Sequence, residues 1–405
     1  MIHIRPFRAW RPTAHTAHLV GSRSFLQYSA DELREKLAGN PYTFLQVVYA
    51  DHDIPGLSRA EHYDRVRAKF LEFVREGIFI REEHPAFFLY EQSSRNFSSR
   101  GLIGAVDVVD YAEGRIRRHE QTLAPREQMF SEYLEHTGIN AEPVLLAVPH
   151  SAPLEALLDQ LSTRPTLFDF ATTDQVRHRF WKVDDPESTA RLQEHFGAMP
   201  AAYIADGHHR CASSSLLAAQ GHAAPGSAKA AFMAFLVPEG ALHINNYDRT
   251  VKGLNGMSPD QFIEALARTG PIRRMDSGED PPRTGCVQVY VGGAWHELEL
   301  PPPATGAPVE QLDAERLNRH VLGPILGIGD LRNEPRVSFV PGVRGRETLA
   351  RKVDSGKADA AFHLRAVSFA QLCAVADSGA CMPPKTTWVE PKLRSGLTIY
   401  SLEDV

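Results

Sequence analysis

The sequence predicts a mixed α/β fold, and two features carry this prediction. Segments with the apolar character of strands alternate with segments of helical periodicity throughout the chain, without an internal repeat or a low-complexity tract. The composition, with 43% hydrophobic and 23% charged residues, is ordinary for a globular protein. A chain of 405 residues buries a large core and usually divides into two or more domains.

The first half of the chain supplies elements of both kinds. The clearest helix is expected over residues 59–76, where apolar side chains recur on one face. A second helix is expected over residues 125–137, because Pro125 suits the first helical position. Strands are expected over residues 43–49, 87–91, 102–109 and 144–148, and a further helix over residues 186–196.

The second half begins with a short apolar strand over residues 201–205, and a helix rich in Ala and Ser follows over residues 211–220. Another buried strand is expected over residues 230–237. Residues 287–300 predict a hairpin that turns at Gly292 and Gly293.

Two breaks rich in Pro and Gly, at residues 277–285 and 301–308, either separate subdomains or are surface loops. We place a boundary at the first of them. Residues 1–275 then form an α/β core, and residues 276–405 form a C-terminal α/β subdomain that carries a basic Pro-Lys segment.

Charge and apolar content exclude several classes of protein. The formal net charge of −6 argues against a nucleic-acid binder, which needs a basic face. The most apolar stretch, residues 230–238, is too short to span a bilayer, and residues 1–12 lack the apolar run of a signal peptide. The 4 cysteines form no Cys-x-x-Cys pair, and so low a count fits a reducing compartment. We therefore expect a cytoplasmic protein with no membrane or nucleic-acid partner, and the sequence leaves a homodimer open.

The segment Ala205-Asp206-Gly207-His208-His209-Arg210 lies between a predicted strand and a predicted helix. Glycine lets the backbone turn sharply, and the helix start presents free N–H groups and a positive dipole end that suit a phosphate. Arg210 adds a bidentate phosphate donor, and the two histidines can donate to phosphate or transfer protons. Asp206 can hold a metal ion or orient a substrate hydroxyl. The alternative is that Asp206 only caps the helix and that the histidines are a surface pair.

Three other groups of residues are weaker candidates. His119 and Glu120 offer an acid–base pair, against the alternative of a solvated charged stretch. Two proline-rich stretches near the C-terminal end can bind an anion or form a docking tail, and their cations are Lys385, Lys392 and Arg394. Asp174, His178 and Trp181 are expected to be structural. The common nucleotide-binding loops, Gly-x-x-x-x-Gly-Lys-Ser/Thr and Gly-x-Gly-x-x-Gly, are absent from the sequence.

Ordered blocks of sequence along nearly the full chain resemble a large family of cytosolic bacterial and archaeal proteins of unknown function. The blocks are Ile4-Arg5-Pro6-Phe7, Asn40-Pro41 with Phe44-Leu45, His119-Glu120, Tyr203 to Arg210, Val251 to Gly256, Pro324 to Ile328 and Met382 to Gly396.

The Asp-Gly-His-His-Arg block also resembles the signature of the ParB/sulfiredoxin superfamily, which includes free serine kinases that phosphorylate L-serine with ATP or ADP. The resemblance implies a ParB/sulfiredoxin-like core with additional α/β subdomains, and a nucleotide phosphate at Gly207, His208 and Arg210. It also implies that Asp206 and His209 take part in phosphoryl transfer. Sulfiredoxin chemistry is not expected, because His208 stands where those enzymes carry their cysteine.

The chain departs from the family at one place. Most members carry Pro-Pro-Tyr-Asp-Val about 16 residues before the Asn-Pro, whereas this chain has Arg23-Ser24-Phe25-Leu26-Gln27. The carboxylate of the common form is missing, and Arg23 can instead neutralise a phosphate or a carboxylate. We predict that Arg23 points into the same cleft as His209 and contacts the anionic group of the substrate; the alternative is a solvated arginine in a surface loop.

These observations favour a phosphotransferase that acts on a small hydroxylated metabolite, first of all L-serine, with ATP or ADP and Mg²⁺. Phosphoryl transfer needs positioning and charge stabilisation, which the motif can supply, and Glu120 would accept the hydroxyl proton. A nucleotide sensor without turnover and a phosphatase or nucleotide hydrolase remain the alternatives.

Overall fold

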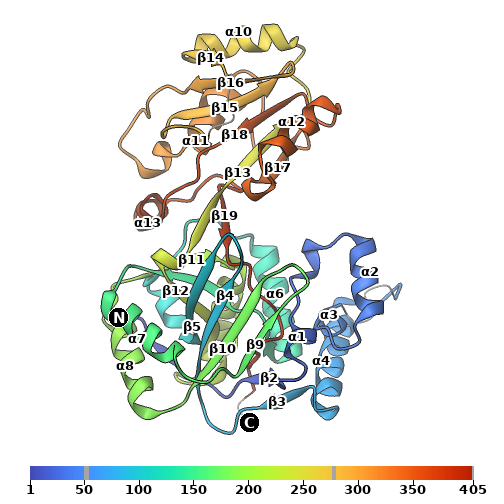
Figure 1. The fold of residues 1–405 in the computed structure, drawn as a ribbon, viewed down its shortest axis with the longest axis vertical. Helices are drawn as coiled ribbons and strands as arrows, with labels where there is room; N and C mark the ends of the chain where they lie inside the picture. Colours follow the sequence, from blue (N-terminus) through green and yellow to red (C-terminus); the bar gives the residue numbers. More distant parts are fainter. Residues whose placement is uncertain (50–53, 276–279, 404–405) are drawn as a thin grey trace. The chain divides into compact units, whose positions relative to one another are not determined.

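The computed structural model of the protein describes residues 1–49, 54–275 and 280–403, and these residues form two compact units (Figure 1). The first unit comprises Met1–Arg117, Thr122–His243 and Pro391–Val405, and the second comprises Arg118–Gln121 and Ile244–Glu390. The unit boundaries therefore differ from the predicted boundary between residues 275 and 276. The chain passes from the first unit into the second and then returns. Residues 277–279 of the first predicted break lie outside the described ranges.

The first unit is built on a 9-stranded mixed sheet. Its strands follow one another in the order β6 (Ile116–Arg117), β11 (Ala202–Asp206), β8 (Val144–Val148), β12 (Ala231–Pro238), β5 (Ser98–Asp107), β4 (Phe87–Ser93), β10 (Arg177–Val183) and β9 (Phe168–Ala171), and β1 (Ile4–Arg5) also pairs with β5. β12 runs parallel to β8 and antiparallel to β5, so the sheet is mixed, as the sequence predicts.

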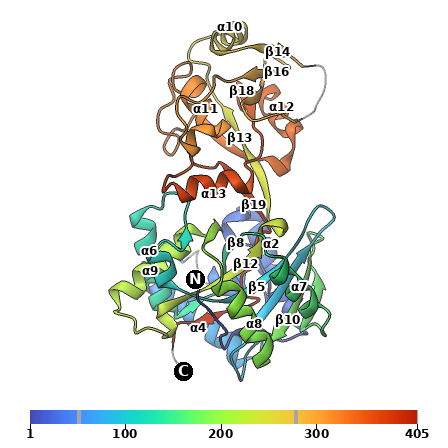
Figure 2. The ribbon, with the colours of Figure 1, turned by 90° about the vertical axis from the view of Figure 1, so that its left-hand side faces the viewer.

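Helices cover both faces of this sheet. Figure 2 shows α6 (Ala124–Thr137) and α9 (His208–Gln220) on one side of the strands, and α7 (Ala152–Ser162) and α8 (Pro186–Gly197) on the other. Buried apolar side chains of α7 and α8 pack against those of the central strands. The apolar core therefore lies between the sheet and these two helices. The remaining helices of the unit are α1 (Ala17–Val20), α2 (Ala30–Gly39), α3 (Leu45–Val48), α4 (Arg59–Arg75) and α5 (Val108–Ala112).

Two small sheets complete the first unit. β2 (Trp10–Pro12) pairs with β3 (Phe79–Arg81). β7 (Ile139–Asn140) pairs with β20 (Tyr400–Ser401), which ties the C-terminal segment of the chain into this unit.

Most elements that the sequence predicts in this unit are confirmed, with shifted ends. α4 begins after a capping box between Ser58 and Glu61, and it buries Phe70 and Phe73. The strand predicted over residues 102–109 ends at Asp107, because α5 begins at Val108.

One predicted element is wrong. Residues 43–49 were expected to form a strand, but they contain the helix α3, in which the N–H of Val48 donates to the carbonyl of Phe44. Phe44, Leu45 and Val47 are all buried, and the apolar residues of this short run follow neither the alternation of a half-buried strand nor enough helical turns to identify a helix.

The second unit contains a 7-stranded sheet. The strands follow in the order β14 (Ile272–Arg274), β16 (Ala294–Glu299), β15 (Cys286–Val291), β18 (Ala360–His363), β13 (His243–Val251) and β17 (Val337–Pro341), and β19 (Thr387–Glu390) also pairs with β13. The predicted hairpin is confirmed as β15 and β16, with Gly292 and Gly293 both at positive φ in the turn.

Helices pack on both faces of this second sheet as well. α10 (Pro259–Thr269) and α11 (Asp313–Leu317) share one apolar core with its strands, and α12 (Arg346–Asp354) contributes to a smaller core that contains Tyr290 and Val340. The unit also contains α13 (Phe369–Asp377).

Candidate functional site

The turn between β11 and α9 has a backbone that only glycine adopts without strain. Gly207 has φ 97° and ψ 28°, and its carbonyl accepts from the N–H of Cys211 to begin the helix. A Cβ atom at Gly207 would lie 3.0 Å from both Nε and Nη2 of Arg210, so the arginine folds over the glycine. α9 begins at His208, three residues before the predicted start, and no side chain caps it.

Asp206 forms an ion pair at the end of β11. Nζ of Lys392 lies 2.9 Å from Oδ2 of Asp206 and donates to it. Burial raises the pKa of this carboxyl, but the attraction of Lys392 and Arg210 outweighs it and lowers the pKa to about 2. Asp206 is therefore ionised at neutral pH, and 43% of its side chain stays exposed to ligands.

Arg210 is held by groups that precede β8. Its Nη1 donates to the carbonyl of Pro143 at 2.7 Å and lies 2.6 Å from Oε1 of Glu142. Glu142 in turn accepts from the hydroxyl of Ser395 at 3.1 Å. Contacts at Nη1 thus fix the position of the guanidinium, while its Nε and Nη2 lie over Gly207. Its phosphate-binding role stays a prediction.

The two histidines differ in their surroundings. His208 is buried, whereas His209 is half-buried and its Nδ1 has no hydrogen-bond partner in the described part of the chain. Burial lowers the pKa of His209, as does the charge of Arg126, while Glu127 opposes the shift. Because its pKa is lowered, His209 is neutral at pH 7 and can accept a proton.

The segment Pro391–Gly396 approaches the turn, as predicted, at Lys392. Ser395 and Ser22 exchange backbone hydrogen bonds of 3.3 Å and 2.8 Å, which ties the segment to the N-terminal part of the unit. Gly396 has φ 84°, and a Cβ atom there would lie 2.6 Å from the ring of Phe44. The segment is therefore fixed along its length, and the predicted approach is confirmed for Lys392.

Arg394 and Arg23 meet at Asp174. Nη2 of Arg394 donates to Oδ2 of Asp174 at 2.6 Å, and Nη2 of Arg23 donates to the same oxygen. The predicted contact of Arg23 with a substrate stays a prediction. Asp174 was expected to be structural, and sequence reasoning missed that it joins two of the predicted anion-binding arginines.

His178 and Trp181 are fully buried on β10, which is consistent with the structural role expected of them. Nδ1 of His178 lies 2.8 Å from the hydroxyl of Tyr90, and Nε1 of Trp181 donates to the carbonyl of Arg164 at 3.0 Å. Burial and the charge of Arg394 lower the pKa of His178 to about 3, so it is neutral at pH 7.

Three predicted site residues belong to the second unit. His119 is buried and its carbonyl accepts from the N–H of Met382, whereas Glu120 is exposed. Lys385 lies over the ring of Tyr247, with Nζ 5.6 Å from the ring centroid. Their part in a site with Asp206 stays a prediction.

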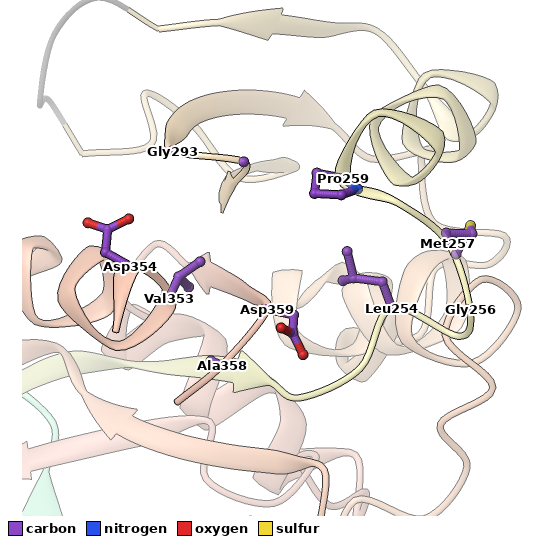
Figure 3. A pocket seen from close by; sticks show the side chains of 10 residues that line it. Leu254, Gly256, Met257, Pro259, Gly293, Val353, Asp354, Ala358 and Asp359 are labelled. Atoms are coloured by element: carbon purple, nitrogen blue, oxygen red, sulfur yellow. The ribbon is translucent and has the colours of Figure 1, made fainter. Parts of the chain in front are cut away.

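A hollow of about 550 Å³ lies in the second unit, between the start of α10, the turn after β15 and the end of α12 (Figure 3). Asp354 and Asp359 are the charged residues of its lining. The hydroxyl of Tyr290 donates to Asp354 at 2.9 Å, and the N–H of Gly253 donates to Asp359 at 2.6 Å. None of the predicted site residues lines this hollow.

The described ranges contain neither a membrane-spanning helix nor a cluster of metal-binding side chains. No helix there is long and apolar enough to cross a membrane. Within the same residues, no group of three or more His, Cys, Asp or Glu side chains could hold a metal ion.

The chain belongs to the family described as "Protein of unknown function (DUF1015)", whose sequence profile matches residues 4–315. The resemblance to a family of unknown function is thereby confirmed over residues 4–315. No curated protein matches the sequence.

Several solved structures are similar to the chain. One is a free serine kinase in complex with AMP, with 14% sequence identity and a TM-score of 0.36 over 74% of this chain and 92% of that one. Another is SbnI with C-terminal truncation from Staphylococcus aureus, with 13% identity and a TM-score of 0.39 over 73% of this chain and 85% of that one. A conserved hypothetical protein from Pyrococcus furiosus has 15% identity and a TM-score of 0.35, over 74% of this chain and 95% of that one.

Proposed function

We propose that the protein is a phosphotransferase that moves a phosphoryl group from ATP or ADP to the hydroxyl of a small metabolite, first of all L-serine. The observation that carries this proposal is the uncapped start of α9, which is flanked by the ionised Asp206 and by Lys392. One anionic and one cationic side chain thus stand beside the N–H groups of the first helical turn, where the helix dipole suits a phosphate.

The start of α9 supplies the phosphate site of this proposal. The backbone N–H groups of His208, His209 and Arg210 form the first turn, where the helix dipole favours negative charge. Lys392 adds a point charge, and Arg210 adds the Nε and Nη2 groups that lie over Gly207. Such groups stabilise the charge that spreads over the phosphoryl oxygens during transfer.

Mg²⁺ fits this site with Asp206 as its protein ligand. Magnesium in nucleotide enzymes is held by one or two carboxylates and by the phosphates of the substrate, so it needs no cluster of protein ligands. When bound, the ion would neutralise phosphate charge.

A proton acceptor is required when the hydroxyl attacks phosphorus. His209 is neutral, and its Nδ1 has no hydrogen-bond partner in residues 1–49, 54–275 and 280–403. Glu120 and His119, which the sequence offers as an acid–base pair, belong to the second unit, and their role stays a prediction. We also propose, with the same motif as support, that the first unit contains a ParB/sulfiredoxin-like core.

A nucleotide sensor without turnover is the second candidate. The charged side chains at the turn, Asp206 and Arg210, are paired within the protein with Lys392 and Glu142. A nucleotide that broke these pairs would move the side chains of Lys392 and Arg210, and this local change would be the conformational signal. A phosphatase or nucleotide hydrolase is the remaining alternative. It would use the same groups, and water would accept the phosphoryl group in place of a metabolite hydroxyl.

One experiment separates these functions. The protein is incubated with Mg²⁺, with ATP or ADP, and with a pool of amino acids, and the products are analysed by mass spectrometry. A new phosphorylated amino acid supports the proposal, free phosphate alone supports a hydrolase, and nucleotide binding without turnover supports a sensor.

Variants test the roles of Asp206 and His209. Asp206→Asn and His209→Ala are expected to keep the melting temperature within a few degrees and to lose turnover. Asp31→Asn and His195→Ala, which change the same residue types on α2 and α8, are the matched controls and should keep full activity. If Asp206→Asn and His209→Ala both unfold, or both stay active, these residues are structural and the proposal loses its basis.

A further inference from the structure

Two arginine side chains converge on a single carboxylate oxygen in the first unit. Arg23 and Arg394 both donate from Nη2 to Oδ2 of Asp174. Their Nη2 atoms therefore lie within about 6 Å of each other, which is twice the length of a hydrogen bond. The hydroxyl of Thr172 donates to the other oxygen, Oδ1, at 2.6 Å, so the carboxylate is held from both sides.

The charges at this point do not balance. Two guanidinium groups meet one carboxylate. Burial raises the pKa of Asp174, but the hydrogen bond from Thr172 and the charges of Arg394 and Arg23 lower it well below its usual range. His178 adds no further charge, because it is neutral at pH 7. The neighbouring pairs, Asp206–Lys392 and Arg210–Glu142, are each neutral. One positive charge is left over, in a chain whose formal net charge is −6.

The donors of the two arginines are also incompletely used. Arg394 is only 5% exposed, yet its Nε has no hydrogen-bond partner among the residues that the structure describes. A buried guanidinium N–H without an acceptor is unfavourable, and such groups in native proteins call for an explanation. Arg23 is 39% exposed and can be reached from solvent. Each guanidinium carries five N–H donors, so both can bind a second anion while they hold Asp174.

The segment Pro391–Gly396 links this pair of arginines to the turn between β11 and α9. Arg394 is two residues from Lys392, whose Nζ donates to Asp206. Two residues of extended chain span at most about 7 Å, so the Cα atoms of Lys392 and Arg394 are no farther apart than that. One short segment therefore carries both the lysine that pairs with Asp206 and an arginine that pairs with Asp174.

We propose that Arg23 and Arg394 bind the carboxylate of a small hydroxylated carboxylic acid, whose hydroxyl receives the phosphoryl group at the turn. This inference rests on the proposed function, and it narrows the substrate class to acids. Asp174 sets the spacing of the two guanidinium groups, and their excess charge attracts one carboxylate. The alternative is an ion-pair network that only fastens the segment Pro391–Gly396 to the hairpin of β9 and β10.

Binding without nucleotide tests this inference separately from phosphoryl transfer. L-serine and D-glycerate carry a carboxylate, whereas ethanolamine and glycerol are close analogues without one. Isothermal titration calorimetry should detect binding of the two acids to the full-length protein and at least 10-fold weaker binding of the two analogues. Equal binding of all four compounds, or no binding of either acid, would overturn the inference.

Arg23→Ala should weaken the binding of both acids by about 10- to 100-fold, the range for losing a hydrogen bond between charged groups. Arg34→Ala removes an exposed arginine of a local ion pair on α2 and is the matched control, which should bind both acids as the unchanged protein does. Arg23→Lys should restore part of the affinity, because it keeps the charge. A purely structural network predicts that Arg23→Ala changes stability and leaves acid binding unaltered, and this result would also overturn the inference.

The two hypotheses fail in different ways. If both acids bind and neither is phosphorylated, the phosphotransferase proposal is wrong and the carboxylate site stands. If ethanolamine is phosphorylated as fast as L-serine, the carboxylate site is wrong and the phosphotransferase proposal stands.

Discussion

Replacing Gly207 by alanine should destabilise the first unit for two separable reasons. The backbone at φ 97° is left-handed, and an alanine there costs about 1–2 kcal/mol. The added Cβ atom would also meet Nε and Nη2 of Arg210 at 3.0 Å. Arg210 must then shift from its bonds to Pro143 and Glu142, which are worth up to about 1.5–3 kcal/mol as hydrogen bonds of a charged group. We expect Gly207→Ala to lose about 2–4 kcal/mol in total, as the shift weakens those bonds only in part.

Gly114→Ala is the matched control, because Gly114 has φ 75° and a Cβ atom there would meet nothing within 4 Å. It should lose only the backbone part, about 1–2 kcal/mol. The assay is urea unfolding followed by tryptophan fluorescence, to which Trp10 and Trp181 contribute from the first unit. Equal losses in the two variants would show that Arg210 does not need the space over Gly207, and the description of this turn would then be wrong.

Two further predictions concern charged groups. Arg210→Ala should weaken ADP binding by about 1.5–3 kcal/mol in calorimetry, and unchanged affinity would remove Arg210 from the phosphate site. In the second unit, burial raises the pKa of Asp313 to about 6, although the N–H of Gly285, at 2.6 Å, and the charge of Arg316 oppose the shift. Because the folded state then holds a proton that the unfolded state releases near pH 4, stability should fall by about 3 kcal/mol as pH rises from about 4 to about 6. Asp313→Asn should remove this dependence in unfolding measured across that range, and an unchanged profile would assign it to another group.

The elements with a regular period could be predicted from the sequence. α4 repeats its apolar residues on one face and begins at a capping box, and the hairpin of β15 and β16 turns at two adjacent glycines. Residues 43–49 could not be predicted, because a mostly apolar run of seven residues is too short for its periodicity to separate a strand from a helix. The unit boundaries were missed for a different reason: they depend on where β13 and the segment Pro391–Gly396 pair, and such pairing is not visible locally.

The candidate site was predictable only where it is local. The strand, the glycine and the helix around Asp206 follow one another in sequence, and the structure confirms their order. Glu142 and Asp174 were missed because each meets its partner across a long stretch of chain, and the Glu-Pro pair before β8 was the only local signal of Glu142. Arg23 and Arg394 were proposed one by one, whereas their convergence on Asp174 needs the fold.

The return of residues 391–405 to the first unit has a consequence for biosynthesis. Lys392 pairs with Asp206 across 186 residues, and Tyr400 pairs with Asn140 across a longer stretch. A ribosome that has made the whole sheet of the first unit must still synthesise the second unit before Lys392 and Arg394 emerge. Until then Asp206 and Asp174 lack these cations, so the nascent chain carries an unfinished site. The second unit is thus an insertion that delays the pairing of Asp206 and Asp174 with these cations until the second unit has been synthesised.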